Sequence, residues 1–526
     1  MDITRFELDI TGQYPRFVRD YLSQKEDTKD FIHFPPNTEG LLAKAASREF
    51  EAERRKVLVE VLREQHAEHL SEAQSKNLGL LEEEDSYTVC TGHQLCLFGG
   101  PVYMLYKISS VIKLCRTLSA SGKVKVVPIF WMASEDHDID EIDNCSLFGR
   151  RFHLKSEHKG PSGTLPLVDI DEVLQELEEV LGESQMAKEG ISLIRSCYEE
   201  GVTMASAFRK LIQSLFAQHG LLILDASDIR LKRVFREHMA KEMGGSLIES
   251  SIRPTLEMIA HRGEKVQAFA RDVNLFYMTK TERIRLSKES GTVSPVEGDK
   301  WSSEEWRTRL KESPDEFSPN VLFRPVYQEY VLPNLAYIGG PGELSYWLQL
   351  KGVFEAFDMK MPVLILRDSL MWMDGKTEKK WNELGFELQD MFRQEDALYK
   401  EFALRTGSSD LDIKPERESM IHQFDKLIDR SAQIDPGILG FAKAERSRLI
   451  KSIENLEKKM IRAEKKKHSD SLNRISTIRS KFLPGGSLRE RSENFLHWYL
   501  RYGAEFIEML LEVSDPLDAR LKVVKV

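Results

Sequence analysis

The pattern of apolar and polar positions predicts a strand–helix–strand unit over residues 86–145. Two short runs rich in β-branched side chains, at 87–91 and 126–133, each stop at a polar cluster. The segment between them carries apolar residues at helical spacing, at Leu105, Ile108, Ile112 and Leu118. Units of this kind bind ligands at the carboxyl ends of their strands, which is where both polar clusters lie.

Further apolar runs predict the rest of a sheet. Buried strands are expected at 221–225, 335–338 and 362–366, and an amphipathic helix at 344–357. We therefore expect an α/β fold whose core is a Rossmann-like, doubly wound parallel sheet.

Between the two halves of this sheet the chain is expected to be mostly helical and then to form a hairpin. Helical periods cover 170–218, 228–243 and 246–270. Two β-rich segments, 275–278 and 283–287, then predict a β-hairpin within a small inserted module.

After Trp372 the apolar residues follow heptad seams, which predict an antiparallel coiled-coil arm. The first seam is Trp381, Leu384, Leu388, Met391, Leu398 and Phe402, and the second is Leu449, Ile453, Leu456, Met460 and Ala463. One terminal helix is expected over 487–510, with Ser487 as N-cap and Glu490 at the capping-box position.

These elements divide the chain into six parts. We expect a helical lead-in (1–85), the first half of the Rossmann-like core with a helical insertion (86–245), the inserted module with its hairpin (246–318), the second half of the core (319–375), the coiled-coil arm (376–483) and a C-terminal helix docking on the core (484–526).

Composition excludes several classes of function. The 526 residues carry a net charge of -10, which disfavours nucleic acid as a partner because phosphate binding needs a basic surface. The basic run 458–467 is better explained as a solvated coiled-coil face. Five cysteines without a CxxC pair predict neither disulfides nor a zinc site. No signal peptide or membrane-spanning segment is expected, so we predict a cytoplasmic protein.

The first polar cluster offers a nucleotide-binding turn. Gly92 permits close backbone approach, His93 and Gln94 add polar groups, and Gly99 and Gly100 precede a proline that fixes the start of the helix. A tight turn with a surface histidine is the structural alternative.

The second cluster, Glu135, Asp136, His137 and Asp138, places three carboxylates and an imidazole at a strand end. Like charges so close need a balancing cation or donors. We expect the cluster to hold a substrate amine, or Mg²⁺ shared with nucleotide phosphates rather than an all-protein metal cage. A solvated acidic loop is the alternative.

Weaker signals lie in the second half. Gly339, Gly340, Gly342 and Glu343 form a glycine-rich turn, and Arg324 stands in an apolar setting that suits a carboxylate, a phosphate or an ion pair with Glu329. A possible second nucleotide site is Trp498, Tyr499 and Arg501, although a helix docking on the sheet needs such aromatics anyway.

Four ordered motifs at 91–108, 131–142, 318–325 and 332–354, with the tail at 486–503, make the chain resemble the bacillithiol-biosynthesis cysteine-adding ligase family over nearly its whole length. The family is similar to class I aminoacyl-tRNA synthetases in its Rossmann-like core, and Gly92 and His93 stand where the signature histidines of those synthetases lie. The zinc-binding cysteines of related cysteine-selecting enzymes are missing, so no zinc is expected.

The resemblance implies a ligase that joins cysteine to the amine of glucosaminyl-malate with ATP, binds ATP or ADP, and dimerises through its coiled coil. We expect catalytic roles for His93 and for Glu135 to Asp138. Nucleotide and substrate contacts are expected from the two glycine-rich turns and from Gln94, Lys107, Arg324, Gln328, Tyr337, Glu343 and Tyr346. Two alternatives remain open: a nucleotidyltransferase that adenylates a small molecule, and a non-catalytic nucleotide-binding coiled-coil protein.

Overall fold

Five parallel strands form the central sheet, in the order β12–β11–β2–β3–β6. They are β2 (Ser86–His93), β3 (Lys125–Met132), β6 (Leu222–Asp225), β11 (Asn334–Gly339) and β12 (Val363–Leu366). The order reverses between β2 and β11, which is the switch point of a doubly wound sheet. The predicted Rossmann-like core is confirmed, and each of its strands lies where the apolar runs placed it.

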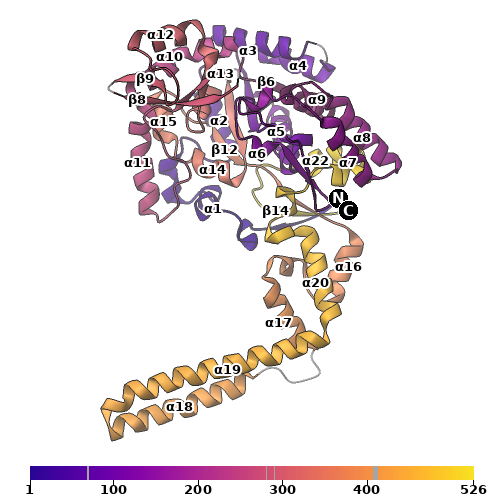
Figure 1. Ribbon diagram of the computed structural model, residues 1–526, viewed down its shortest axis with the longest axis vertical. Helices are drawn as coiled ribbons and strands as arrows, with labels where there is room; N and C mark the ends of the chain where they lie inside the picture. The colour runs from indigo at the N-terminus through magenta and orange to yellow at the C-terminus, as the bar shows by residue number, and fades with distance from the viewer. Residues whose placement is uncertain (68–69, 280, 290, 407–412) are drawn as a thin grey trace. The chain divides into compact units, whose positions relative to one another are not determined.

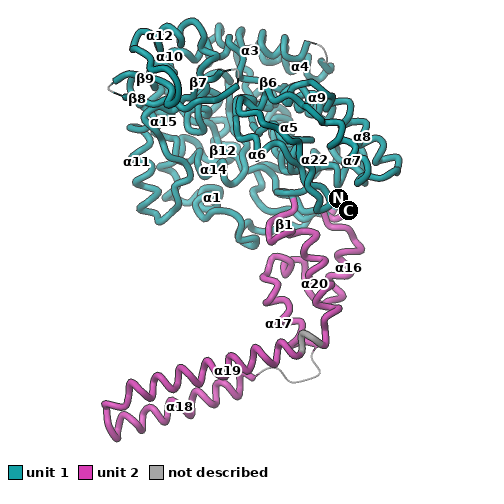
Figure 2. The backbone as a smooth tube through the Cα atoms, viewed as in Figure 1, with its two compact units in different colours: residues 1, 3–371, 490–524 teal, residues 2, 372–489, 525–526 magenta. Residues whose placement is uncertain are grey.

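The computed structural model describes residues 1–67, 70–279, 281–289, 291–406 and 413–526. They form two units (Figure 2). The first contains residue 1 and residues 3–371 and 490–524, and the second contains residue 2 and residues 372–489 and 525–526. None of the helices in these ranges combines the length and the apolarity needed to cross a bilayer.

The sheet is buried because its strands are apolar nearly throughout. Seven of the eight residues of β3 are buried, as expected for a parallel sheet covered on both faces. Helix α5 (Tyr103–Ala120) joins β2 to β3 and packs against both. The N-terminal part contributes β1 (Asp2–Phe6), α1 (Arg16–Leu22), α2 (Thr38–Ala46), α3 (Ala52–Gln65) and α4 (Glu72–Leu81).

Helices and a small hairpin separate β3 from β6. They are α6 (Ile139–Ile142), β4 (Asn144–Leu147), β5 (Arg150–His153), α7 (Ile170–Leu181), α8 (Gln185–Cys197) and α9 (Met204–Phe216). The predicted helical stretch is confirmed, whereas the β4–β5 hairpin was not expected.

Helix α10 (Ile229–Gly245) follows β6. The inserted module then begins with α11 (Leu247–His261) and carries its own sheet, in the order β10–β7–β8–β9. Its strands are β7 (Leu275–Met278), β8 (Arg283–Glu289), β9 (Thr292–Pro295) and β10 (Phe317–Pro319), with α12 (Ser303–Glu312) between the last two. The predicted hairpin of β7 and β8 is confirmed. The helix expected to continue to residue 270 was wrong, because α11 ends at His261 and Gly263 adopts a φ of +70°.

The second half of the core contains α13 (Arg324–Val331), α14 (Pro341–Trp347), α15 (Lys351–Ala356) and β13 (Ser369–Met373). The single helix predicted over 344–357 was wrong: the structure has two short helices, α14 and α15, separated at 348–350. Most apolar positions of that range are nevertheless buried, namely Leu344, Trp347, Leu348, Leu350, Val353, Phe354 and Phe357.

The second unit contains an antiparallel helical hairpin (Figure 1). Its helices are α18 (Lys414–Ile434) and α19 (Leu439–Lys467). Arg417 on α18 pairs with Glu454 on α19. Asp425 lies two turns further along α18 and pairs with Arg446, which lies two turns earlier along α19. The unit also holds α16 (Gly375–Glu383), α17 (Glu395–Thr406) and α20 (Ser469–Phe482).

The coiled coil is therefore confirmed, but the pairing of its seams was wrong. The seam at 449–463 lies on α19, whose antiparallel partner is α18. The seam at 381–402 spans two separate helices, α16 and α17, because Gly385 adopts a φ of +78° and ends the first of them. Leu456, expected in the seam, is 57% exposed.

The chain then returns to the first unit. Here α21 (Leu496–Tyr502) and α22 (Glu505–Val513) replace the single predicted helix, because Gly503 adopts a φ of +57° between them. Ser487 does not cap a helix there. The last strand, β14 (Leu521–Lys525), was not expected and lies in a three-stranded sheet of order β1–β14–β13.

Candidate active site

A cavity of about 730 Å³ opens in the first unit at the carboxyl ends of β2, β3, β6 and β11. This is the edge of the sheet, beside the switch point, at which doubly wound folds bind ligands. Among the residues that line it are these sequence-predicted ones: Gly92, His93, Gln94, Lys107, Glu135, Asp136, Arg324, Tyr337, Glu343 and Tyr346. The two halves of the core thus bring their polar clusters to one place.

The turn between β2 and α5 is held in a conformation that few residues adopt. Phe98, Gly99 and Gly100 have φ values of +49°, +80° and +62°. Asn494 fixes the turn from the C-terminal segment, since its Nδ2 donates to the carbonyls of Phe98 at 2.9 Å and Gly100 at 2.7 Å. A Cβ on Gly100 would lie 2.6 Å from that of Cys96. Neither glycine lines the cavity; both shape the entry to α5.

The protons on His93 follow from its partners. Nδ1 lies 2.9 Å from the carbonyl oxygen of Gln94, which can only accept, so Nδ1 carries the proton. Nε2 lies 3.1 Å from the hydroxyl of Tyr103. Burial, together with the charge of Lys107, lowers the pKa of His93 to about 4. The ring is therefore neutral at pH 7 and Nε2 accepts from Tyr103.

A buried ion pair joins the two halves of the core. The amine of Lys107 lies 2.7 Å from Glu343 Oε2 and donates to the carbonyl of Gly92 at 2.5 Å. Glu343 also accepts the Tyr337 hydroxyl at 2.5 Å and the Gly340 amide at 2.8 Å. Burial raises the pKa of this carboxyl, but these partners outweigh it and hold the pKa below its usual value.

The glycine-rich turn before α14 is close-packed. A Cβ on Gly339 would lie 2.8 Å from Leu344 and 3.1 Å from the Tyr337 ring. Gly340 is the N-cap residue of α14, and its amide donates to the Glu343 carboxylate. A Cβ on Gly342 would meet no atom within 4 Å. None of the three glycines lines the cavity, so their placement serves the position of Glu343.

Arg324 faces the cavity without a carboxylate partner. It donates to Gln328 at 3.0 Å and to the Tyr346 hydroxyl at 3.5 Å, and its guanidinium lies over the rings of Tyr337 and Trp347. No ion pair among the described residues includes it. Glu329 instead accepts from Asn334 at 2.7 Å. Gln328 is buried behind Arg324 and orients it.

The acidic cluster after β3 divides into two. Glu135 pairs with Lys232, a fully buried amine 2.7 Å away, and accepts from Ser318 at 3.1 Å. Asp136 accepts from Gln94 at 2.9 Å, from its neighbour's amide at 2.8 Å, and lies 3.6 Å from Arg283. Burial opposes ionisation, yet these donors and the Arg283 charge hold the pKa of Asp136 well below its usual value.

His137 and Asp138 are exposed and do not line the cavity. The ring of His137 lies 3.3 Å from Arg283 and 5.6 Å from Phe276, on the inserted module. Asp138 lies just before α6, where its carbonyl accepts the Glu141 amide.

Sequence reasoning missed several cavity residues. Tyr103 lies inside the motif at 91–108, but only its contact with His93 in the structure identifies it as a site residue. Arg283 and Lys232 reach the acidic cluster from distant segments. Phe269, on the irregular segment after α11, lines the cavity although its side chain is 72% exposed. No sequence pattern predicts the positions of Arg283, Lys232 and Phe269, because they depend on how the chain from α10 to β10 folds against the sheet.

The second possible nucleotide site lies elsewhere. Trp498 and Tyr499 on α21 are buried, with the Trp498 ring stacked 5.9 Å from Phe506 and Tyr499 edge-on to Phe495. Arg501 is exposed and lies over the ring of Tyr502. The two buried aromatics thus serve packing of α21, and none of the three residues reaches the cavity.

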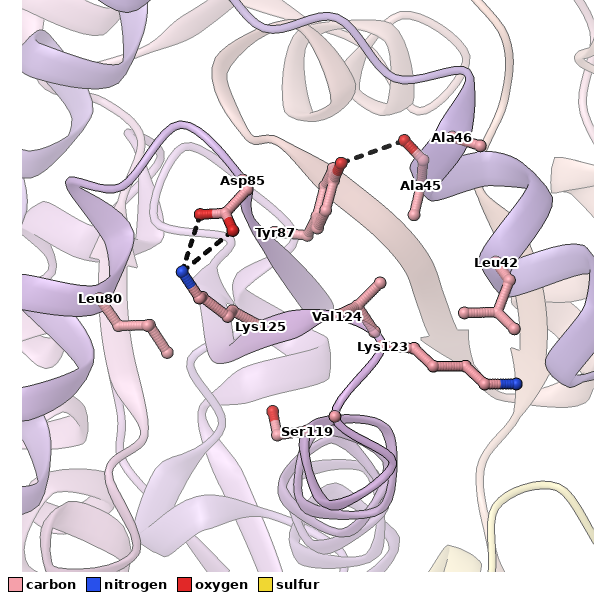
Figure 3. A pocket seen from close by; sticks show the side chains of 11 residues that line it. Leu42, Ala45, Ala46, Leu80, Asp85, Tyr87, Ser119, Lys123, Val124 and Lys125 are labelled. Carbon is pink, nitrogen blue, oxygen red and sulfur yellow. Dashed lines mark hydrogen bonds and ion pairs between the residues drawn. The ribbon is translucent and has the colours of Figure 1, made fainter.

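Another cavity, of about 560 Å³, lies at the amino ends of β2 and β3 (Figure 3). There the Tyr87 hydroxyl donates to Ala45 at 3.1 Å and Lys125 pairs with Asp85 at 3.0 Å, while Lys123 points away from both. It is at the opposite end of the strands from the predicted site. Within the described ranges, no three His, Cys, Asp or Glu side chains are grouped to hold a metal ion.

Comparison with known proteins also divides the chain near residue 369, but it assigns residues 490–524 to the second part, whereas the structure places them in the first unit. Residues 1–368 match the model "Bacillithiol biosynthesis BshC, N-terminal Rossmann-like domain", and residues 370–526 match "Bacillithiol biosynthesis BshC, C-terminal coiled-coil domain". A protein named "Putative cysteine ligase BshC" from Christiangramia forsetii is 36% identical over 526 residues, covering 98% of this chain and 97% of its own. Those so named from Flavobacterium johnsoniae and Bacillus cereus (strain AH187) are 35% and 28% identical, covering 98% and 97% of each chain.

A solved structure described as a putative arginyl-tRNA synthetase from Campylobacter jejuni aligns with 88% of this chain and 98% of its own. Its identity is 11% and its TM-score 0.20, values too low to support an argument.

Proposed function

Because this chain belongs to the BshC family of bacillithiol biosynthesis, whose members are named as cysteine ligases, we propose that it joins the carboxyl of cysteine to the amine of glucosaminyl-malate. The proposal includes ATP as the source of the activated leaving group, and the cytoplasm as the place of reaction. It also includes a homodimer formed through the coiled coil.

The observation that carries the proposal is the uncompensated cation in the cavity. Glu343 neutralises Lys107, Glu135 neutralises Lys232, and Asp136 faces Arg283. Arg324, which is partly buried, has only neutral hydrogen-bond partners. Arg271 also lines the cavity and is in no ion pair among the described residues, but its side chain is exposed. A guanidinium removed from water is costly unless an anion pairs with it. A substrate that brings a carboxylate or phosphate group would supply that anion.

The residues present fit a nucleotide and two small substrates. Arg324, Lys107, Tyr337 and Tyr346 surround the cationic end of the cavity. Gly92 lines the cavity with its backbone, and a Cβ there would crowd the Trp131 carbonyl at 3.3 Å. Glu135 and Asp136 at the other end suit an amine, or an Mg²⁺ ion carried by nucleotide phosphates. ATP would supply an activated cysteine carboxyl.

The test is a reaction of the purified protein with cysteine, glucosaminyl-malate and Mg²⁺-ATP, followed by mass spectrometry. Formation of the amide, with AMP or ADP as co-product, supports the ligase. Accumulation of an adenylated small molecule without amide would support a nucleotidyltransferase. Nucleotide binding without any product would support a non-catalytic protein.

Arg324→Met provides a residue-level test of the same proposal. Losing one charged hydrogen bond costs about 1.5–3 kcal/mol, so the affinity for the anionic substrate that it contacts should fall about ten- to a hundredfold. Calorimetry with ATP and with glucosaminyl-malate separately shows which substrate that is. Arg307→Met, on the exposed face of α12, is the control. Unchanged affinity for both substrates would contradict an anion site at Arg324.

A further inference from the structure

The hydrogen bonds around His93 leave it no N–H with which to contact a ligand. Its one proton lies on Nδ1 and is donated to the Gln94 carbonyl. Its free lone pair, on Nε2, accepts the Tyr103 hydroxyl at 3.1 Å. A ligand in the cavity therefore reaches His93 through Tyr103, whose oxygen keeps lone pairs that can accept another proton.

Tyr103 is held firmly in this position. It is the first residue of α5, and it lines the cavity. The guanidinium of Arg367 lies 5.0 Å from the centre of its ring, and Arg367 is fixed in turn by a buried ion pair with Glu490 at 2.8 Å. Burial raises the pKa of Tyr103 above its usual value, so the hydroxyl keeps its proton until another group takes it.

The carboxylates that line the cavity are poorly placed to accept a proton. They are Glu135, Asp136 and Glu343, and each lies within 4 Å of a cation, respectively Lys232, Arg283 and Lys107. An ionised carboxylate paired with a cation gives up that pairing when it is protonated. Neutral His93 remains as a residue of the cavity wall that can accept a proton, through the lone pair on its Nε2.

From this geometry we propose that Tyr103 and His93 form a proton relay that takes the proton from the attacking amine. The inference rests on the proposed ligase function. The amine nitrogen bonds to the activated cysteine carbonyl carbon, and the bond from that carbon to the leaving oxygen breaks, with its electron pair leaving on that oxygen. The amine proton passes to the Tyr103 oxygen, while the Tyr103 proton passes to His93 Nε2.

The charges around the imidazole decide when it can accept. Lys107 and Arg367 face it as cations and Glu343 as an anion, while Tyr103 and Cys96 are its nearest neutral titratable neighbours. The cations disfavour the imidazolium in the free protein. An anionic nucleotide beside them would offset that effect, so the relay becomes effective when the cavity is filled.

The kinetic test compares Tyr103→Phe, His93→Gln and the double variant in the amide-forming reaction. Each single variant should lose about a hundredfold in kcat, with KM for ATP nearly unchanged. The double variant should be no slower than either single one, because the two residues act as a unit. The free amine becomes more abundant with pH for every variant alike, but the Tyr103→Phe rate should rise more steeply with pH than the wild-type rate, because solvent base must then take the proton.

Tyr87→Phe is the matched control. It also removes a tyrosine hydroxyl, but at the amino end of β2, the strand whose carboxyl end carries His93 (Figure 3). It should leave kcat and the pH profile unchanged. Wild-type kcat in Tyr103→Phe, or losses that multiply in the double variant with an unchanged pH profile, would overturn the relay while leaving the ligase function intact.

A measurement independent of activity separates the two proposals. In the full chain labelled with ¹⁵N-histidine, His93 should carry its proton on Nδ1 at pH 7, and the Nε2 signal should shift in Tyr103→Phe but not in Tyr87→Phe. A proton found on Nε2 would refute the relay even in an active enzyme. Absence of amide product from the wild type, with these shifts observed, would refute the ligase function instead.

Discussion

Burial keeps His66 and His93 neutral, and the partners of each ring decide which nitrogen carries the proton. His66, just after α3, donates from Nδ1 to the Leu62 carbonyl at 2.8 Å and accepts the Ile223 amide at Nε2, 3.0 Å away. Burial lowers its pKa to about 4. The protonated ring could not accept the Ile223 amide, so protonation and this contact are mutually exclusive.

This residue makes stability depend on pH in a defined direction. The folded pKa of about 4 lies below the ordinary value of 6.5, so the stabilisation is complete above pH 6.5 and is lost as the pH falls toward 4. At pH 5 proton uptake by the unfolded chain should lower the free energy of unfolding by about 2 kcal/mol for this one group. Urea unfolding at pH 7 and pH 5 measures the loss.

His66→Gln should reduce that loss, because an amide oxygen can accept from Ile223 without titrating. His422→Gln, at an exposed position on α18, should not. An equal decline of stability between pH 7 and pH 5 in wild type and His66→Gln would show that other groups dominate.

The candidate site shows what residue patterns can and cannot predict. Strand-end clusters placed His93, Glu135 and Asp136 together because parallel strands end at one edge of a sheet. The same reasoning treated His137 and Asp138 as part of the cluster, yet the chain leaves the cavity as it turns into α6. Contacts that depend on the fold of the inserted module, such as those of Arg283, could not be read from spacing.

At the scale of elements, side chains cover the β6 edge of the central sheet. Strand β6 is the last in its order, and an unpaired edge invites pairing with another chain. Gln65 accepts the Asp225 amide at 2.9 Å, Arg209 donates to the Ile223 carbonyl at 3.0 Å, and Gln74 donates to the Leu221 carbonyl at 2.7 Å. With His66, these side chains replace a neighbouring strand.

Helix continuity was the least predictable feature, for a physical reason. Apolar spacing reports which positions are buried, and Trp381, Met391 and Phe402 are indeed buried. It does not report whether the backbone between them stays helical. Gly385 and Gly503 adopt positive φ, and helices end at them inside ranges whose apolar spacing predicts one continuous helix.

Exposed apolar side chains on the helical hairpin are where we expect the proposed dimer to form. Ile453 is buried within the hairpin, but Leu427, Phe441 and Leu456 are 52%, 69% and 57% exposed. Apolar side chains so exposed on a coiled coil are candidates for an intermolecular seam. Phe441→Asp with Leu456→Asp should convert a dimer to a monomer at micromolar concentration, as measured by light scattering.

Ser447→Asp, which adds a charge at an exposed polar position of α19, should leave the dimer intact. A wild-type monomer at micromolar concentration would exclude dimerisation through the hairpin. A dimer that survives the double substitution would place the interface elsewhere.

At the scale of the molecule, the Rossmann-like unit is discontinuous in sequence. Residues 490–524 belong to it although a whole second unit intervenes. Glu490 bonds Arg367 at 2.8 Å, Ser369 at 2.9 Å and the Leu370 amide at 3.0 Å, all buried. Asn494 holds the turn before α5. The return segment therefore completes both halves of the site.

Deleting residues 372–489 and joining the ends through a short Gly/Ser linker should preserve a folded core, because Leu370 and Glu490 are in direct contact. A fragment of residues 1–371 should lack a cooperative thermal transition, since Glu490, Asn494 and β14 are gone. Circular dichroism on heating tests both. Cooperative melting of the 1–371 fragment would show that the return segment is dispensable.

The discontinuity also sets the order of events during synthesis. A ribosome delivers the chain from its N-terminus, and domains generally fold as they emerge. Here Asn494, which holds the turn that shapes the site, is made 394 residues after Gly100 of that turn. The helical hairpin, built from neighbouring segments, can form before the sheet domain is complete. A polypeptide that stops before Asn494 would therefore lack an assembled site, and activity would begin only after the ribosome has made that residue.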